Sequence, residues 1–211
     1  DLKGPLQGII GLAGLLMEQS GVRVFPEVGV YAERIEGEAD RLASMVSALT
    51  AFTRMGNPPP TVTRVDLAAL IDRLCASSIR RHTERFPRFK IAPELAPVHA
   101  DEALLSMAIE AVIDNAVTFT EGQPLTIEVG FEHSDSGYGE LTIQDRGIGI
   151  PEYAIESVFE LFARLDKRRN QGIGVGLTMA RKAVELCGGM LSLESALGQD
   201  TLVRFTLALA D

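Results

Sequence analysis

The sequence Asp-Arg-Gly-Ile-Gly-Ile at residues 145–150 decides the fold of the second half of the chain. Residues 140–144 before it alternate polar and apolar side chains, a pattern that predicts a strand, so the two glycines form a turn directly after a strand. A second glycine run, Gly-Ile-Gly-Val-Gly-Leu at 172–177, comes immediately before a segment at 177–187 with helical apolar periodicity. A strand followed by a glycine turn, and a glycine loop followed by a helix, predict strands with helices packed on them.

The other segments of this half also divide into strands and helices. We expect one mixed, mostly antiparallel sheet with helices on one face, which is an α/β sandwich. Asp101 is a good N-cap for one of the helices. The expected strands are 65–67, 89–91, 97–99, 125–131, 140–144, 190–194 and 202–209, and the expected helices are 67–83, 101–118 and 177–187.

The first 56 residues carry two apolar seams of heptad type. One runs from Leu2 to Leu16 and the other from Val28 to Phe52, with a Gly- and Pro-containing break at 21–26. Two such helices form a hairpin that buries little surface alone, so pairing of two copies into a dimeric four-helix bundle would cover the seams. A helical arm folded against its own chain is the alternative.

The run Gly-Asn-Pro-Pro-Pro at 56–60 ends the second helix, because three prolines cannot continue it. We therefore expect an α+β chain in three parts. A helical hairpin occupies 1–56, a proline-rich linker 57–61 and the α/β sandwich domain 62–211.

Composition excludes several classes of function. The 211 residues carry a net charge of −9, which gives no overall basic field for nucleic acid or anionic lipid. No run of about 18 apolar residues occurs, so we expect no membrane contact by this part of the protein. Cys75 and Cys187 lie far apart without metal-ligand spacing, which fits two core residues in a reducing, cytoplasmic compartment.

Residues of the first glycine turn fit the base-binding part of a nucleotide pocket. A carboxylate at Asp145 can accept a hydrogen bond from the exocyclic amine of adenine, which would select adenine over guanine. Gly147 and Gly149 lack a Cβ atom, so the backbone can turn sharply and approach the base. An ordinary turn after a strand is the alternative.

The second glycine run and the 101–118 helix fit the phosphate end of such a pocket. Gly172, Gly174 and Gly176 let backbone N–H groups converge on phosphate oxygens at the positive end of a helix. Asn115 offers a neutral amide oxygen as a Mg²⁺ ligand. An asparagine on the helix surface is the alternative.

Residues 151–171 between the glycine runs combine aromatic and basic side chains. Such a loop could close over a triphosphate. Packing phenylalanines and a solvated basic loop are the alternatives. The residues concerned are Phe159, Phe162, Arg164, Lys167, Arg168 and Arg169.

In their order along the chain, these segments resemble the sequence boxes of the GHKL superfamily of sensor histidine kinases, type II topoisomerases, Hsp90 and MutL. Residues 113–116 resemble the N box, 145–150 the G1 box, 159–162 the F box and 172–177 the G2 box. An F box in this place points to sensor histidine kinases, and the resemblance covers essentially the whole chain. It implies ATP and Mg²⁺ as cofactors.

The N box departs from the family pattern at two positions. Ala111 stands where a second asparagine is common, and Thr118 stands where a lysine is common. Loss of that lysine removes a phosphate contact, so the resemblance implies reduced ATP affinity or turnover.

Residues 1–6, Asp-Leu-Lys-Gly-Pro-Leu, resemble the phospho-acceptor box of histidine kinases without its histidine. The family box begins with His, so the acceptor would immediately precede Asp1. The resemblance implies that Asp1 is the general base that activates this histidine for attack on the γ-phosphate. Gly4 replaces a family Thr or Asn, which implies weak phosphatase activity. We expect packing or surface roles for His82, His99 and His133.

Three functions compete. In the preferred one, a homodimeric kinase below an upstream sensor domain passes phosphate to the receiver domain of a response regulator. A signalling scaffold without catalysis is the second, favoured by the missing histidine and the altered N box. A hydrolytic ATPase is the third, but its activating glutamate would stand at Ala111, and Glu110 points about 100° away on an ideal helix.

Overall fold

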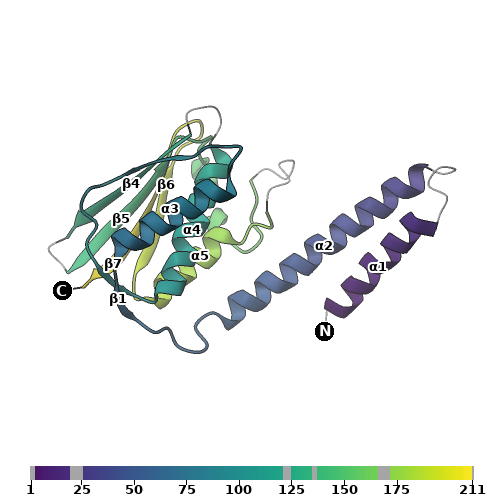
Figure 1. The fold of residues 1–211 in the computed structure, drawn as a ribbon, viewed down its shortest axis with the longest axis horizontal. Coiled ribbons are helices and arrows are strands. Elements are labelled where there is room, and N and C mark those ends of the chain that lie inside the picture. Colours follow the sequence, from purple (N-terminus) through teal and green to yellow (C-terminus); the bar gives the residue numbers. More distant parts are fainter. Residues whose placement is uncertain (1–2, 20–25, 121–124, 135–136, 166–171, 211) are drawn as a thin grey trace. The chain divides into compact units, whose positions relative to one another are not determined.

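The structure, a computed structural model, describes residues 3–19, 26–120, 125–134, 137–165 and 172–210 (Figure 1). By its contacts the chain divides into two units, Asp1–Arg54 and Met55–Asp211. Among the described residues, none of the helices combines the length and the apolar character needed to cross a membrane.

The first unit is a helical hairpin of α1 (Lys3–Gln19) and α2 (Pro26–Arg54), which confirms the predicted pair of helices. Small side chains fill their contact, since Ala13, Ala32 and Ala39 are buried. Pro26 is the first residue of α2 rather than part of the break, because a proline loses no hydrogen bond at that position. Larger apolar side chains of the hairpin stay exposed: Ile9, Leu12, Leu15, Val30, Tyr31, Ile35, Leu42 and Leu49.

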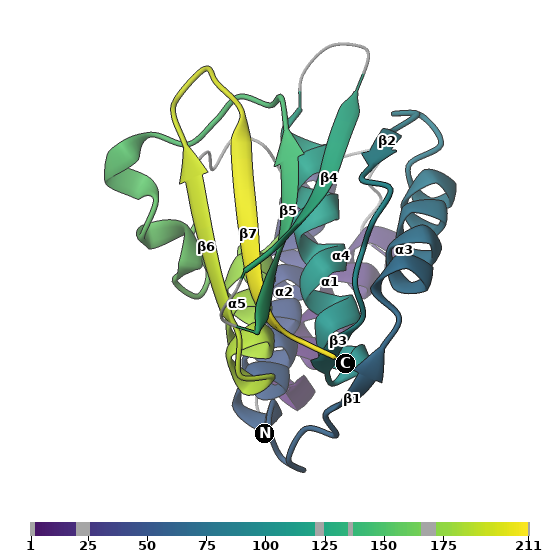
Figure 2. The same cartoon turned by 90° about the vertical axis from the view of Figure 1, so that its left-hand side faces the viewer.

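The second unit is a seven-stranded sheet with helices on one face, as predicted (Figure 2). The strand order is β1-β3-β7-β5-β4-β2, and β6 pairs with β7. β2 runs parallel to β4, and the other described pairs are antiparallel. The strands are β1 (Thr63–Val65), β2 (Arg88–Ile91), β3 (Val98–Ala100), β4 (Thr126–His133), β5 (Tyr138–Asp145), β6 (Met190–Ser195) and β7 (Thr201–Leu209).

Three helices cover this sheet: α3 (Leu67–Arg81), α4 (Glu102–Phe119) and α5 (Gly176–Leu186). Two short 3₁₀ turns, η1 (Glu152–Ala154) and η2 (Ser157–Phe159), lie between β5 and α5. The core fills the space between the helices and the sheet, where burial of apolar surface provides the main stabilisation. Its fully buried side chains include Leu67, Ile71, Leu105, Ile109, Ile113, Ile127, Leu141, Ile143 and Phe205.

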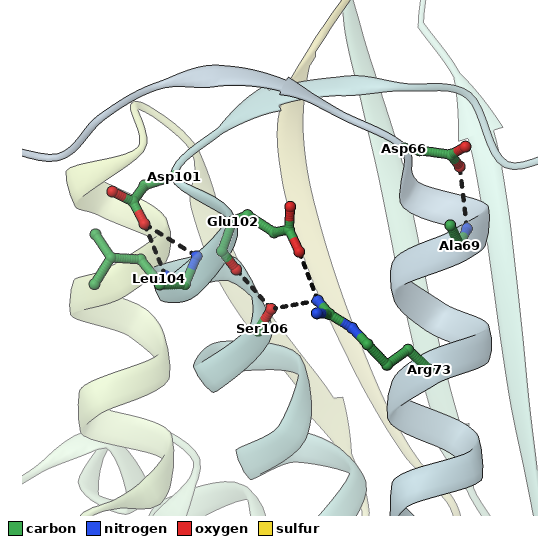
Figure 3. A network of polar contacts seen from close by, with 8 residues as sticks. Asp66, Ala69, Arg73, Asp101, Glu102, Leu104 and Ser106 are labelled. Atoms are coloured by element: carbon green, nitrogen blue, oxygen red, sulfur yellow. Dashed lines mark hydrogen bonds and ion pairs between the residues drawn. The ribbon is translucent and has the colours of Figure 1, made fainter.

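Aspartate caps begin α3 and α4, as Figure 3 shows. Asp66 accepts a hydrogen bond from the Ala69 N–H at 3.0 Å, and Asp101 accepts from Ala103 and Leu104 at 3.0 and 3.1 Å. Each such cap contributes about 1 kcal/mol. The predicted strand at 65–67 is therefore wrong in place, because β1 ends before the cap and Leu67 is already helical.

Residues 55–61 belong to the second unit by their contacts. Met55 packs against the core. The Thr61 N–H donates to Asp101 Oδ2 at 2.8 Å, and this bond is the first of the causes that lower the pKa of Asp101. The chain thus enters the second unit beside the start of α4.

The sheet face away from the helices is polar. Arg204 on β7 bonds Glu140 on β5 at 2.9 Å and Glu194 on β6 at 3.1 Å. Lys90 and Glu128 pair across β2 and β4 at 3.0 Å. Cross-strand ion pairs of this kind fit a solvated sheet face opposite a buried one.

Candidate nucleotide site

Asp145 ends β5 with its side chain largely buried, at 8% exposure. Its Oδ1 accepts a hydrogen bond from the Gly147 N–H at 2.7 Å. Burial raises the pKa of Asp145 to about 6, the Gly147 bond opposes this rise, and the charge of Asp200 adds to it. The carboxyl group is thus an ionised acceptor at neutral pH, in the chemical form needed to bind an exocyclic amine.

The turn after Asp145 requires glycine at two positions. A Cβ atom on Gly147 would lie 2.6 Å from Asp145 Oδ1 and 2.7 Å from the Phe119 carbonyl oxygen. Gly149 has φ +67°, and its Cβ would lie 1.9 Å from the Ala196 carbonyl oxygen. The turn is thus pressed between the end of α4 and the loop joining β6 to β7.

That loop supports the turn through hydrogen bonds. The Ile150 N–H donates to Ser195 Oγ at 2.9 Å, and the Gly198 N–H donates to the Ile148 carbonyl at 2.7 Å. Ser195 Oγ also donates to the Asp200 carbonyl at 3.0 Å. Ser195 carries no signal of this role in the sequence, because nothing local links it to a turn 45 residues earlier.

Asn115 is half-buried on α4, one turn from the helix end. The preceding Asp114 is bonded by Arg81 of α3 at 2.9 Å. One turn before Asn115, Ala111 faces α5, since a Cβ on Gly176 would lie 3.7 Å from the Ala111 Cβ. The helix carrying Asn115 therefore adjoins both the first glycine turn, through Phe119, and the start of α5.

The second glycine run leads into α5, whose first residue is Gly176. Gly172 and Gly174 have φ +71° and +76°, and a Cβ on Gly174 would lie 2.4 Å from the Ala163 carbonyl oxygen. The Gly174 carbonyl accepts from the Phe162 N–H at 2.7 Å. Gly174 thus brings the chain close against residues 162–163 just before the helix begins.

The remaining expected residues divide into three groups. Phe159 is a core residue at 6% exposure, which supports the packing alternative rather than a contact with nucleotide. Phe162 and Arg164 are partly exposed on the segment that follows it. Asp1 and Lys167 lie outside the described residues.

Two buried hydroxyl groups border these turns without a hydrogen-bond partner in the described structure. Thr120 directly follows α4 and Thr178 lies in the first turn of α5. An unpaired buried hydroxyl costs about 1–3 kcal/mol. The Asn115 amide and the glycine N–H groups are a donor and acceptor set that suits a Mg²⁺-bound nucleotide.

Comparisons with known proteins agree with this geometry. The family model of histidine kinase-, DNA gyrase B- and HSP90-like ATPases matches residues 100–211, just over half of the chain. Cyanobacterial phytochrome B of Nostoc sp. is 28% identical over 209 residues, covering 98% of this chain and 28% of that protein. Sensor protein CreC of Escherichia coli is 31% identical over 200 residues, covering 92% and 40%. Sensor-like histidine kinase SenX3 of Mycolicibacterium smegmatis is 30% identical over 223 residues, covering 100% and 55%.

Solved structures share the fold. Full-length ShkA in complex with AMPPNP has a TM-score of 0.70 and 25% identity, covering 99% of this chain and 44% of that one. The mycobacterial sensor histidine kinase MprB has a TM-score of 0.62 and 28% identity, covering 70% and 97%. The chain spans between about a quarter and just over half of the three curated relatives. It belongs to the family of histidine kinase-, DNA gyrase B- and HSP90-like ATPases, as the catalytic ATPase core of a sensor histidine kinase.

Proposed function

We propose that the chain is the ATP-dependent protein-histidine kinase core of a two-component system. It phosphorylates a histidine just before Asp1 and passes the phosphate to the receiver-domain aspartate of a response regulator. The observation that carries the proposal is the convergence of three elements: the Asp145 turn, the Asn115 helix and the glycine run that begins α5. The preceding helical hairpin would present the acceptor.

Asp145 and its turn recognise the base. The ionised carboxylate accepts a hydrogen bond from the adenine amine, and the buried site strengthens that bond. Gly147 and Gly149 keep the backbone within reach of the base, because side chains there would collide with neighbouring carbonyls.

Asn115 and the second glycine run hold the phosphates. The Asn115 amide oxygen would ligate Mg²⁺, and backbone N–H groups at Gly174 and Gly176 would donate to phosphate oxygens at the α5 N-terminus. When bound, Mg²⁺ would neutralise charge on the transferred phosphoryl group. Asp1 would take the proton from the histidine ring nitrogen.

The surroundings of Asn115 favour transfer over hydrolysis. A hydrolytic relative needs a carboxylate one turn before the asparagine, and Ala111 stands there, against Gly176. Glu110 is ion-paired to Arg81 on α3 instead. Neither residue can activate water beside a phosphate bound at Asn115.

The exposed apolar side chains of the hairpin support a homodimer. They include Leu12, Tyr31 and Leu42, which a second copy would cover in a four-helix bundle. The relatives are longer than this chain, which supports an upstream sensor domain in the same polypeptide. We place the kinase core in the cytoplasm, where a response regulator is available.

The scaffold is the second candidate, favoured by Ala111 and Thr118 in the N box. It predicts a folded dimer without phosphorylation. Phosphate labelling of the histidine distinguishes the two candidates.

The test uses a protein extended N-terminally through the residue before Asp1, incubated with γ-labelled ATP and Mg²⁺. A kinase acquires an acid-labile, base-stable label, and Asn115→Ala abolishes it. Asn115→Asp is the matched control, because it keeps an oxygen ligand and should retain part of the labelling. Tight Mg·ATP binding without label would indicate the scaffold, and neither binding nor label would refute the enzyme.

A further inference from the structure

The segment between the two glycine runs is tied to α5 by Arg181. The Arg181 guanidinium carbon lies 3.4 Å from the centroid of the Phe159 ring, and Nη2 lies 3.8 Å from Glu156 Oε2. The Glu156 side chain is 88% exposed, so this ion pair contributes little. The Phe159 ring is buried, so the cation–π contact is the stronger of the two.

A second contact joins the same segment to the glycine run. The Phe162 N–H donates to the Gly174 carbonyl at 2.7 Å. Phe162 and Gly174 have φ of +67° and +76°, and Gly174 packs directly on the backbone of Ala163. A positive φ at a phenylalanine is costly and persists only where its surroundings hold it.

The two contacts close a ring within the chain. Arg181 on α5 holds Phe159, three residues before Phe162, and Phe162 holds Gly174, two residues before α5 begins at Gly176. Through Phe159 and Phe162, α5 therefore helps to fix the conformation of the turn at Gly174 that precedes it. Opening the ring at Arg181 would free Gly174 from one of its supports.

We propose that Arg181 is a positioning residue for the phosphate-binding turn at Gly174–Gly176. It touches Phe159 and Glu156, and acts on bound phosphate only through the ring. The inference rests on the proposed nucleotide site, because it assigns the turn its phosphate-binding role. If Arg181 had a purely structural role, its loss would lower the stability and would weaken the binding of ATP and of adenosine to the same extent.

The test compares variants of the 211-residue chain for binding of Mg·ATP and adenosine by calorimetry. Arg181→Ala should weaken ATP about three- to tenfold, the size of one lost cation–π contact, and change adenosine less than about twofold. Arg181→Lys should restore part of the ATP affinity. Arg80→Ala is the matched control, since it removes an exposed arginine from α3 of the same unit.

Two further measurements make the test independent of folding. Phe159→Leu should reproduce the ATP loss, and the double variant with Arg181→Ala should be no weaker than either single one, because both open the same ring. Amide exchange of Phe162, the donor in the ring, should speed up in Arg181→Ala with or without nucleotide.

Each outcome decides between the proposals. Equal losses for ATP and adenosine, or unchanged ATP affinity with unchanged Phe162 exchange, would overturn the role of Arg181. If the native chain binds no ATP but Arg181→Ala still accelerates Phe162 exchange, the proposed function fails while the ring stands. If the native chain binds no ATP and Arg181→Ala leaves Phe162 exchange unchanged, both the proposed function and the role of Arg181 fail.

Discussion

Replacement of Asp145 by asparagine should stabilise the protein while weakening its binding of ATP. The carboxyl group is buried, and burial raises its pKa from 3.8 to about 6. Because the folded pKa lies above the unfolded one, the protonated carboxyl favours folding below about pH 4. That stabilisation is lost as the pH rises through 6, so the native protein carries the full cost of the charge at neutral pH.

The size of the effect follows from the pKa change. A rise of roughly two units corresponds to about 3 kcal/mol at 1.36 kcal/mol per unit, which is an upper bound for the gain. The asparagine oxygen can still accept from the Gly147 N–H, so that bond is kept. We expect Asp145→Asn to raise the free energy of unfolding by about 1–3 kcal/mol near pH 8 and to leave it unchanged near pH 4.

The assay is urea unfolding of both proteins at several pH values between these limits. Asp200→Asn is the control, because it removes the neighbouring charge but keeps the buried one, so its gain should be smaller. In parallel, Asp145→Asn should weaken ATP roughly 10- to 100-fold above pH 6, the loss of one charged hydrogen bond. A variant less stable than the native protein near pH 8, or a gain independent of pH, would refute the reasoning.

Two further substitutions test the support of the turn. Gly149→Ala should lower the free energy of unfolding by more than about 3 kcal/mol and abolish ATP binding, because its Cβ meets the Ala196 carbonyl. Gly198→Ala is the control, because Gly198 also has a positive φ but has open space around its Cβ. It should lower the free energy of unfolding, measured by thermal unfolding, by only about 1 kcal/mol. Ser195→Ala removes the acceptor of the Ile150 N–H, so it should lower the free energy of unfolding by about 1–2 kcal/mol and weaken ATP binding in titrations. Ser192 is exposed on the same strand, so Ser192→Ala should change neither the stability nor the ATP affinity.

Local signals in the sequence predict most of the elements of the second unit. Asp101 marks the start of α4 correctly because a cap acts within three residues. The strand placed at 65–67 shows the limit of pattern alone. Val65 and Leu67 are both buried around a polar residue, which is the pattern of a strand, but Asp66 is a cap and the two neighbours belong to different elements.

Contacts between distant segments could not be predicted. The parallel pairing of β2 with β4 depends on the path of the whole sheet. Phe159 looks like a nucleotide contact in the sequence, but Arg181 and the core bury it. Ser195 supports a turn far away along the chain. In each case the deciding partner is brought near only by tertiary packing, so no local pattern marks it.

The two oxygens of Asp101 have a mechanical consequence. One holds the first turn of α4 and the other holds the backbone at Thr61, where the chain arrives from the helical hairpin. A pull on the polypeptide at residue 61 is therefore transmitted to the start of α4 through the Asp101 carboxylate, as well as to β1 along the chain. Force delivered along the chain from the hairpin would thus reach the helix on which Asn115 lies through one side chain.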